Sequence, residues 1–208
     1  MLTILFIHFA GLISPGPDFF YVVRQSASHS VKSGVLAATG ISIGIIFWAA
    51  FAIFGLAWLS NSIGSLFQYA IMIIGGCYLV YIGSQMVRVT ENIIFVENKA
   101  QLTPLNPWQE IKKGLLINIF INAKAGVYFT SVISAYVDNL SNTLQMFELL
   151  LLFVVSTFIY FCVVALLFSR RPVRLFYAKY SRYIDNISGV IFILFGSMLI
   201  YEGFSHFI

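Results

Sequence analysis

The chain has 208 residues, of which 60% are hydrophobic and only 10% are charged, and its formal net charge is +4. A soluble domain of this size needs more polar surface, so this composition and a mean hydropathy of +0.91 exclude that class and indicate a protein embedded in lipid. The two cysteines, Cys77 and Cys162, lie in separate apolar segments without CxxC spacing, so we expect neither a disulfide framework nor a thiol-relay site.

Six apolar segments follow one another along the chain, and each has the length of about 20 residues that a helix needs to cross the hydrocarbon core. They cover residues 2–23, 35–59, 66–87, 114–137, 149–168 and 187–207. None of the segments alternates apolar and polar residues as the strands of a membrane β-barrel do. In the first segment hydrophobicity resumes after a break, which argues against a cleaved signal peptide. The predicted fold class is an all-α integral membrane protein with six transmembrane helices.

The first segment is interrupted at "ISPGPDFFYVV" by Pro15, Gly16 and Pro17, and Asp18 follows at once. The two prolines remove backbone donors, so we expect two half-helices, with the second beginning near Asp18. A carboxylate at bilayer depth is costly and indicates a functional site. The alternative is that Asp18 only caps the second half-helix and that the prolines form a packing kink.

Basic residues are confined to alternate connections. The connections after the first, third and fifth segments hold 11 of the 12 Lys and Arg residues, and those after the second and fourth hold none. The positive-inside rule therefore predicts cytoplasmic basic loops and both termini outside. The basic stretch 169–182 is expected to contact lipid headgroups rather than nucleic acid.

The chain divides into two similar halves: repeat 1 at about 1–88, a cytoplasmic linker at about 89–112 and repeat 2 at about 113–208, all within a single membrane domain. Three positions match between the halves: Gly76 with Gly189 and Gly83 with Gly196 at an offset of 113, and Ser14 with Asn122 at an offset of 108. Three segments per half is an odd number, so the second half is predicted to be inverted in the membrane, as in many transporters. Gly40 and Gly44 form a GxxxG pattern, which indicates close helix packing.

Lys124 is the one basic residue inside a predicted span, and the repeat places it near Asp18. Two charges of opposite sign suit a zwitterion, whose ammonium Asp18 can accept while Lys124 or a helix N-terminus faces its carboxylate. Asn118 and Asn122 lie four residues apart on one helix face and can orient polar groups. The alternative is that Asp18 and Lys124 pair with each other to lower the cost of burial.

The motifs "ISPGPDFFYVVRQS", "GVLAATGISIG", "GGCYLVYIGSQMVR" and "GLLINIFINAKAGVYF" resemble the LysE/RhtB superfamily of bacterial amino-acid exporters, and most closely its threonine/homoserine efflux branch. The resemblance covers nearly the whole chain. It implies six spans, a location in the cytoplasmic (inner) membrane, proton-driven export of small amino acids, and roles for Pro15 to Asp18, Asn122 and Lys124. The family pattern Asn-Pro-Lys is here Asn122-Ala123-Lys124, which leaves the second repeat without its proline, or with a break supplied by Gly126.

The sequence thus predicts a secondary transporter rather than an enzyme, with a small amino acid, protons and the bilayer as its partners and no cofactor, resident metal or nucleic acid. No nucleotide-binding loop is present in the sequence. A homodimer is left open. The alternatives are an exporter of metal ions or other small solutes, which needs clustered ligands, and a membrane assembly or scaffold protein, which does not explain the buried charges.

Overall fold

The computed structural model describes residues 2–14, 16–63, 65–92, 94, 106–134 and 142–205. Every regular element in these ranges is helical, which confirms the all-α class. The elements are α1 (Leu2–Ile13), α2 (Pro17–Ser28), α3 (Val31–Ile63), α4 (Ser65–Val87), α5 (Pro107–Leu116), the π-helical turn η1 (Ile117–Ile121), α6 (Ala123–Ser134), α7 (Thr143–Phe168) and α8 (Arg171–Ser205).

Four of these helices are long and apolar enough to cross a membrane: Val31–Leu56, Tyr69–Val87, Thr143–Phe168 and Arg171–Ser205. They overlap the second, third, fifth and sixth predicted segments. The first predicted segment is divided between α1 and α2, and the fourth between the end of α5, η1 and α6. Helix α5 begins at Pro107, so the end of the segment predicted as a linker is helical.

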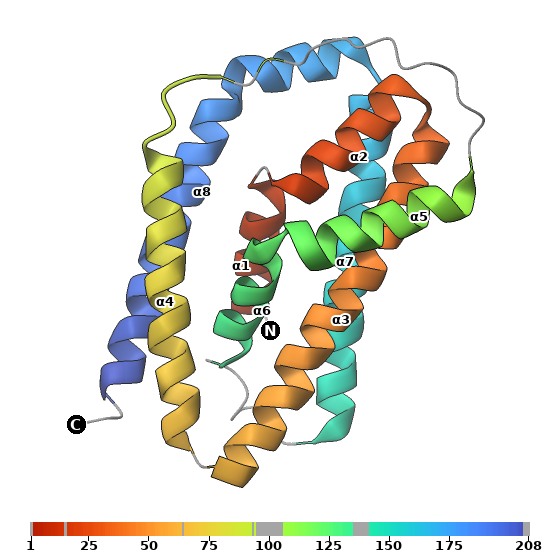
Figure 1. Cartoon of the computed structure of the whole chain (residues 1–208). Helices are drawn as coiled ribbons and strands as arrows, with labels where there is room; N and C mark the ends of the chain where they lie inside the picture. Colours follow the sequence, from red (N-terminus) through yellow and green to blue (C-terminus); the bar gives the residue numbers. More distant parts are fainter. Residues whose placement is uncertain are drawn as a thin grey trace.

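The long helices stand side by side and enclose the short ones. Figure 1 shows α4 beside α8 and α3 beside α7, with α1 and α6 between the two pairs and α5 crossing toward them. Helix α3 is central, because it contacts α2, α4, α5, α6 and α7. The divided helices therefore meet in the interior of the bundle.

Glycines allow α4 and α8 to touch at two points. A Cβ built on Gly76 would lie 2.7 Å from the carbonyl oxygen of Gly196, and one built on Gly83 would lie 2.6 Å from that of Gly189. The reverse contacts are equally close, at 2.6 Å for Gly196 on Gly76 and 2.7 Å for Gly189 on Gly83. Each contact joins residues of both halves, and exchanging the matched positions converts one contact into the other.

A second glycine contact sets α5 against α3. A Cβ on Gly114 would lie 2.5 Å from the carbonyl oxygen of Ala37, and a Cβ on Gly40 would collide with the carbonyl oxygen of Ile111. Because the two backbones approach this closely, the chain after α5 reaches Gly44, one helical turn further along α3. This contact brings η1 into the interior.

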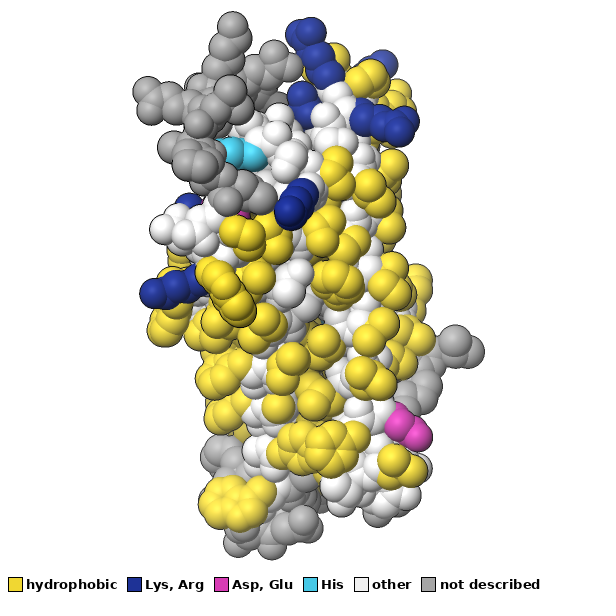
Figure 2. All heavy atoms as spheres, turned by 90° about the vertical axis from the view of Figure 1, so that its right-hand side faces the viewer, with side chains coloured by type: hydrophobic (Ala, Val, Ile, Leu, Met, Phe, Trp, Pro, Cys, Tyr) yellow, Lys and Arg dark blue, Asp and Glu magenta, His cyan; other side chains and the backbone are white. Residues whose placement is uncertain are grey.

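The outer surface is apolar along most of the bundle. Figure 2 shows one face covered by hydrophobic side chains, with Lys and Arg side chains gathered at its upper end. Large apolar side chains more than half exposed occur on many elements; Phe6, Ile74, Phe120, Leu151 and Leu194 are examples. An exposed apolar surface of this extent suits contact with lipid.

Candidate functional site

The first half of the site is a break between two helices. Helix α1 ends at Ile13 and α2 begins at Pro17, while Gly16 is extended, with φ −154° and ψ −178°. Proline fits the first position of a helix, since that residue needs no N–H partner. Gly16 therefore occupies the N-cap position and Asp18 the first turn of α2; Pro15 lies outside the described residues.

The second half of the site is a break at Asn122. The N–H of Asn122 donates to Ile117 at 2.9 Å, which closes the π-helical turn, and Asn122 then leaves helical geometry with φ −89° and ψ 67°. Helix α6 starts at Ala123, so the break persists without the proline. Gly126 lies inside α6 against the ring of Trp48 and does not supply the break.

The two breaks meet through side chains. The amide nitrogens of Asn118 and Asn122 both donate to Oδ2 of Asp18, each at 2.7 Å. All three residues are buried, with exposed fractions of 0% for Asn118, 8% for Asn122 and 6% for Asp18. An ionised carboxylate accepts and does not donate, so two amide donors on one of its oxygens fit the charged form of Asp18.

This arrangement turns the amide oxygens away from Asp18. Within the described residues, no hydrogen-bond donor reaches the side-chain oxygen of Asn118 or of Asn122. Buried acceptors are normally satisfied, and Asn122 borders a cavity, so its oxygen indicates a place for a donor from a ligand or water, whereas the oxygen of Asn118 faces Gly44 of α3. Together with the Asp18 carboxylate, the Asn122 oxygen suits a positively charged group that carries several N–H donors.

Asn118 is held by Gly44 and Trp48 of α3. Gly44 of α3 makes room for it, since a Cβ there would lie 2.8 Å from both Cβ and Cγ of Asn118. The indole N–H of Trp48 donates to its backbone oxygen at 3.3 Å. Gly126 leaves space for the Trp48 ring in turn. The GxxxG pattern of α3 therefore shapes the site as well as the packing.

A cavity of about 60 Å³ adjoins Asp18 and Asn122. Its volume is several times the roughly 10–15 Å³ that one water needs. The remaining lining is mostly apolar and comes from α1, α2, α3, α6 and α7: His8, Gly11, Leu12, Ser14, Gly16, Phe19, Ile45, Ala125, Tyr128, Phe129 and Phe161. A few convergent polar groups in an apolar cavity are typical of a small-molecule site.

His8 is one of the polar residues that line this cavity. Its Nε2 lies 3.2 Å from Oγ1 of Thr157, and its ring centroid lies 4.9 Å from that of Phe153. The ring is buried among aromatic side chains of α6 and α7, including Phe129 at 6.0 Å. The His8 ring thus links α1 to α6 and α7 at the cavity.

One predicted site residue, Lys124, is not placed by these contacts. The backbone of Lys124 belongs to α6, but its side chain lies outside the described part of the structure, so its pairing with Asp18 stays a prediction. Within the described residues, no group of three or more His, Cys, Asp or Glu side chains is placed to hold a metal ion.

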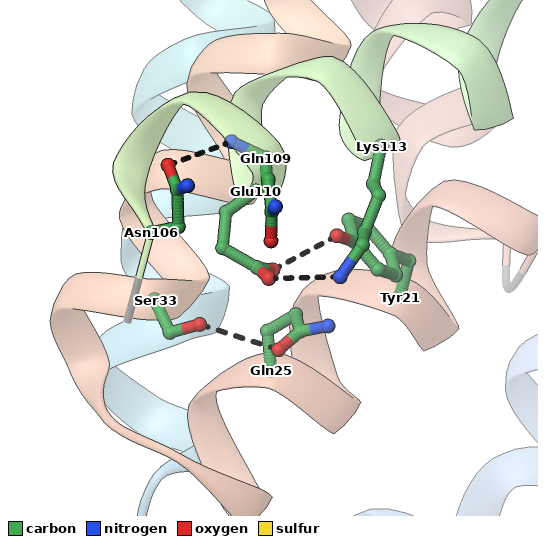
Figure 3. A network of polar contacts seen from close by, with 7 residues as sticks. All are labelled: Tyr21, Gln25, Ser33, Asn106, Gln109, Glu110 and Lys113. Atoms are coloured by element: carbon green, nitrogen blue, oxygen red, sulfur yellow. Dashed lines mark hydrogen bonds and ion pairs between the residues drawn. The ribbon is translucent and has the colours of Figure 1, made fainter. Parts of the chain in front are cut away.

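Sequence reasoning missed a polar network that joins α2 to α5 (Figure 3). The Tyr21 hydroxyl donates to Oε2 of Glu110 at 3.0 Å, and Lys113 Nζ lies 3.2 Å from Oε1 of the same carboxylate. A signal for the start of α5 was present: Asn106 precedes Pro107, and its side chain accepts from the N–H of Gln109 at 3.4 Å. Asn followed by Pro and then by Gln at the third position is typical of a helix N-terminus.

Comparison with known proteins assigns the chain to a protein family. Residues 9–203 match the family described as LysE type translocator, and the chain belongs to this family. It is 42% identical to an uncharacterized membrane protein of Haemophilus influenzae over 100% of this chain and 99% of that protein. It is 36% identical to the threonine efflux protein of Escherichia coli over 96% of each chain. A leucine efflux protein of Klebsiella pneumoniae is 27% identical over 90% of this chain and 88% of its own. No solved structure matches.

Membership in this family confirms the resemblance read from the sequence motifs and makes the chain a membrane transporter rather than an enzyme.

Proposed function

We propose that the protein exports small amino acids, threonine- or homoserine-like, across the cytoplasmic membrane by alternating access with proton antiport. The observation that carries this proposal is the buried Asp18 carboxylate, held by two amides of the other half of the chain beside a cavity. The relative named threonine efflux protein supports the substrate class.

Inverted repeats support alternating access. The breaks at Ser14–Gly16 and at Asn122 occur at matched positions of the two halves, and the glycine contacts between α4 and α8 exchange with each other under the same matching. A transporter of this kind binds its substrate where the repeats meet and rocks one repeat against the other. Here the repeats meet at Asp18, Asn118 and Asn122.

The site chemistry supports an amino-acid substrate. An ammonium group has three donors, and the Asp18 carboxylate and the amide oxygen of Asn122 are acceptors beside the cavity. Lys124 or the N-terminus of a half-helix faces the substrate carboxylate in the proposed complex. The small cavity favours small substrates.

Asp18 also provides the coupling. In the proposed cycle, ionised Asp18 binds the substrate from the cytoplasm, the halves rock, and an external proton neutralises Asp18 so that the substrate leaves. The proton then passes inward. A membrane potential of about 100 mV supplies roughly 2.3 kcal/mol per proton, which corresponds to about fifty-fold accumulation.

The distribution of basic residues supports the orientation, with both termini outside and the ends of α2, α4 and α7 at the cytoplasmic surface.

The test is counterflow in proteoliposomes loaded with unlabelled amino acids. We expect labelled threonine or homoserine to accumulate against the loaded amino acid, and efflux to accelerate when the receiving side is made acidic. Failure of every amino acid in a panel to drive counterflow would exclude the proposed function.

A further inference from the structure

Glu110 is a buried carboxylate that the proposed cycle does not use. Its side chain is 11% exposed, whereas that of Lys113 is 55% exposed. One oxygen accepts from the Tyr21 hydroxyl of α2, and the other faces the Lys113 ammonium. Figure 3 shows Tyr21 reaching from α2 to this carboxylate on α5. Both carboxylate oxygens therefore have donors, and one donor is an amine.

Glu110 contacts α2 about one turn from Asp18, on the side of Arg24. Along α2, Tyr21 follows Asp18 by three residues toward Arg24. Along α5 and η1, Glu110 precedes Asn118 by about two turns. Helix α2 is thus joined to η1 through Asp18 and Asn118, and to α5 through Tyr21 and Glu110.

Resting on the export function proposed above, we propose that Glu110 is an inner binding site for the substrate ammonium, occupied before Asp18. The ammonium of an amino acid has the same donors as that of Lys113 and can take the place of the Tyr21 hydroxyl on Oε2. Its arrival breaks the bond that ties α2 to α5. Lys113, which is half exposed, is then beside the substrate carboxylate.

A purely structural role for Glu110 makes a different prediction. An acidic residue in the first turn and a Lys three residues later stabilise a helix wherever it lies, and the Tyr21 bond would add a tie between two helices. Loss of either Tyr21 or Glu110 would then disturb the protein in the same direction. If Tyr21 instead competes with the substrate for Glu110, the two losses act in opposite directions.

The experiment measures the KM for threonine on the cytoplasmic side, using gradient-driven uptake into inside-out membrane vesicles. Glu110→Gln keeps the shape but removes the charge, and KM should rise about ten-fold, the effect of one charge-assisted hydrogen bond. Tyr21→Phe removes only the competitor, and KM should fall by about two- to three-fold, the effect of one weak hydrogen bond. The double variant should behave as Glu110→Gln alone, since Tyr21 acts only through Glu110.

Matched controls are Glu148→Gln on α7 and Tyr201→Phe on α8, both at exposed positions, and neither should change KM. An unchanged KM in Glu110→Gln, or a rise in both Tyr21→Phe and Glu110→Gln, would overturn the inner site while leaving the export function intact. A wild-type protein that takes up no amino acid in these vesicles would instead exclude the export function, and the inner site with it. The amount and melting temperature of each variant separate loss of folded protein from loss of affinity.

Discussion

Gly44→Ala tests how the site is held in place. The added Cβ would lie 2.8 Å from Cβ and Cγ of Asn118, too close for either atom to stay, so Asn118 must move away from α3. Its amide then loses the 2.7 Å hydrogen bond to Asp18. A hydrogen bond to a charged group contributes about 1.5–3 kcal/mol. Because Asn122 still donates to Asp18, we take the lower end, which corresponds to roughly ten-fold weaker substrate binding.

The assay is exchange of labelled threonine in proteoliposomes, with the half-saturating concentration as the readout. Gly55→Ala is the matched control, since nothing lies within 4 Å of a Cβ at that position of the same helix. Alanine also favours a helix over glycine by roughly 0.5–1 kcal/mol, so the control should be neutral or slightly more stable. The double variant Gly44→Ala with Asn118→Ala should bind no more weakly than Asn118→Ala alone. Wild-type affinity in Gly44→Ala would refute this account of how Asn118 is positioned.

Three further predictions concern packing, the second break and orientation. Gly83→Ala should destabilise the protein by about 1–3 kcal/mol, because its Cβ would lie 2.6 Å from the carbonyl oxygen of Gly189. The measurement is the melting temperature, which should fall. An unchanged melting temperature would show that α4 and α8 are not in tight contact. Ala123→Pro should retain transport and stability, because Ala123 is the first residue of α6, where proline is well accommodated; loss of folded protein would mean that the helix does not start there. With the native cysteines replaced, a cysteine at Asn142 should react with an impermeant thiol reagent from outside and one at Lys179 only from inside, and the opposite pattern would reverse the proposed direction of transport.

Several of the predictions rest on local features that can be recognised in the sequence alone. Three such features indicated the candidate site: a proline-glycine-proline interruption, an intramembrane carboxylate and two asparagines four residues apart. The offset between the halves predicted that Lys124 lies near Asp18, and because the Lys124 side chain lies outside the described residues this stays a prediction. The structure adds that Asn118 and Asn122 share one oxygen of Asp18, a detail that depends on how α5 crosses α3 at Gly40.

The break at Asn122 could not be derived from residue type, because it has no proline. It arises from a π-helical turn, in which Asn122 donates five residues back to Ile117, and that geometry depends on tertiary packing rather than on local propensity. The Tyr21–Glu110 bond was missed for a related reason. It joins residues 89 positions apart, and the segment that contains Glu110 was interpreted as a polar linker although its capping residues indicated a helix.

The central claim is that Asp18 couples the amino acid to the proton. Proteoliposomes that hold wild-type protein and an internal pH indicator are exposed to threonine, which enters down its gradient. Antiport predicts that protons leave and that the interior becomes alkaline. Asp18→Asn keeps the side-chain shape but cannot titrate, so the same threonine pulse should leave the internal pH unchanged, whether or not threonine itself still exchanges. Alkalinisation in Asp18→Asn equal to that of the wild type, at equal protein content, would contradict the account.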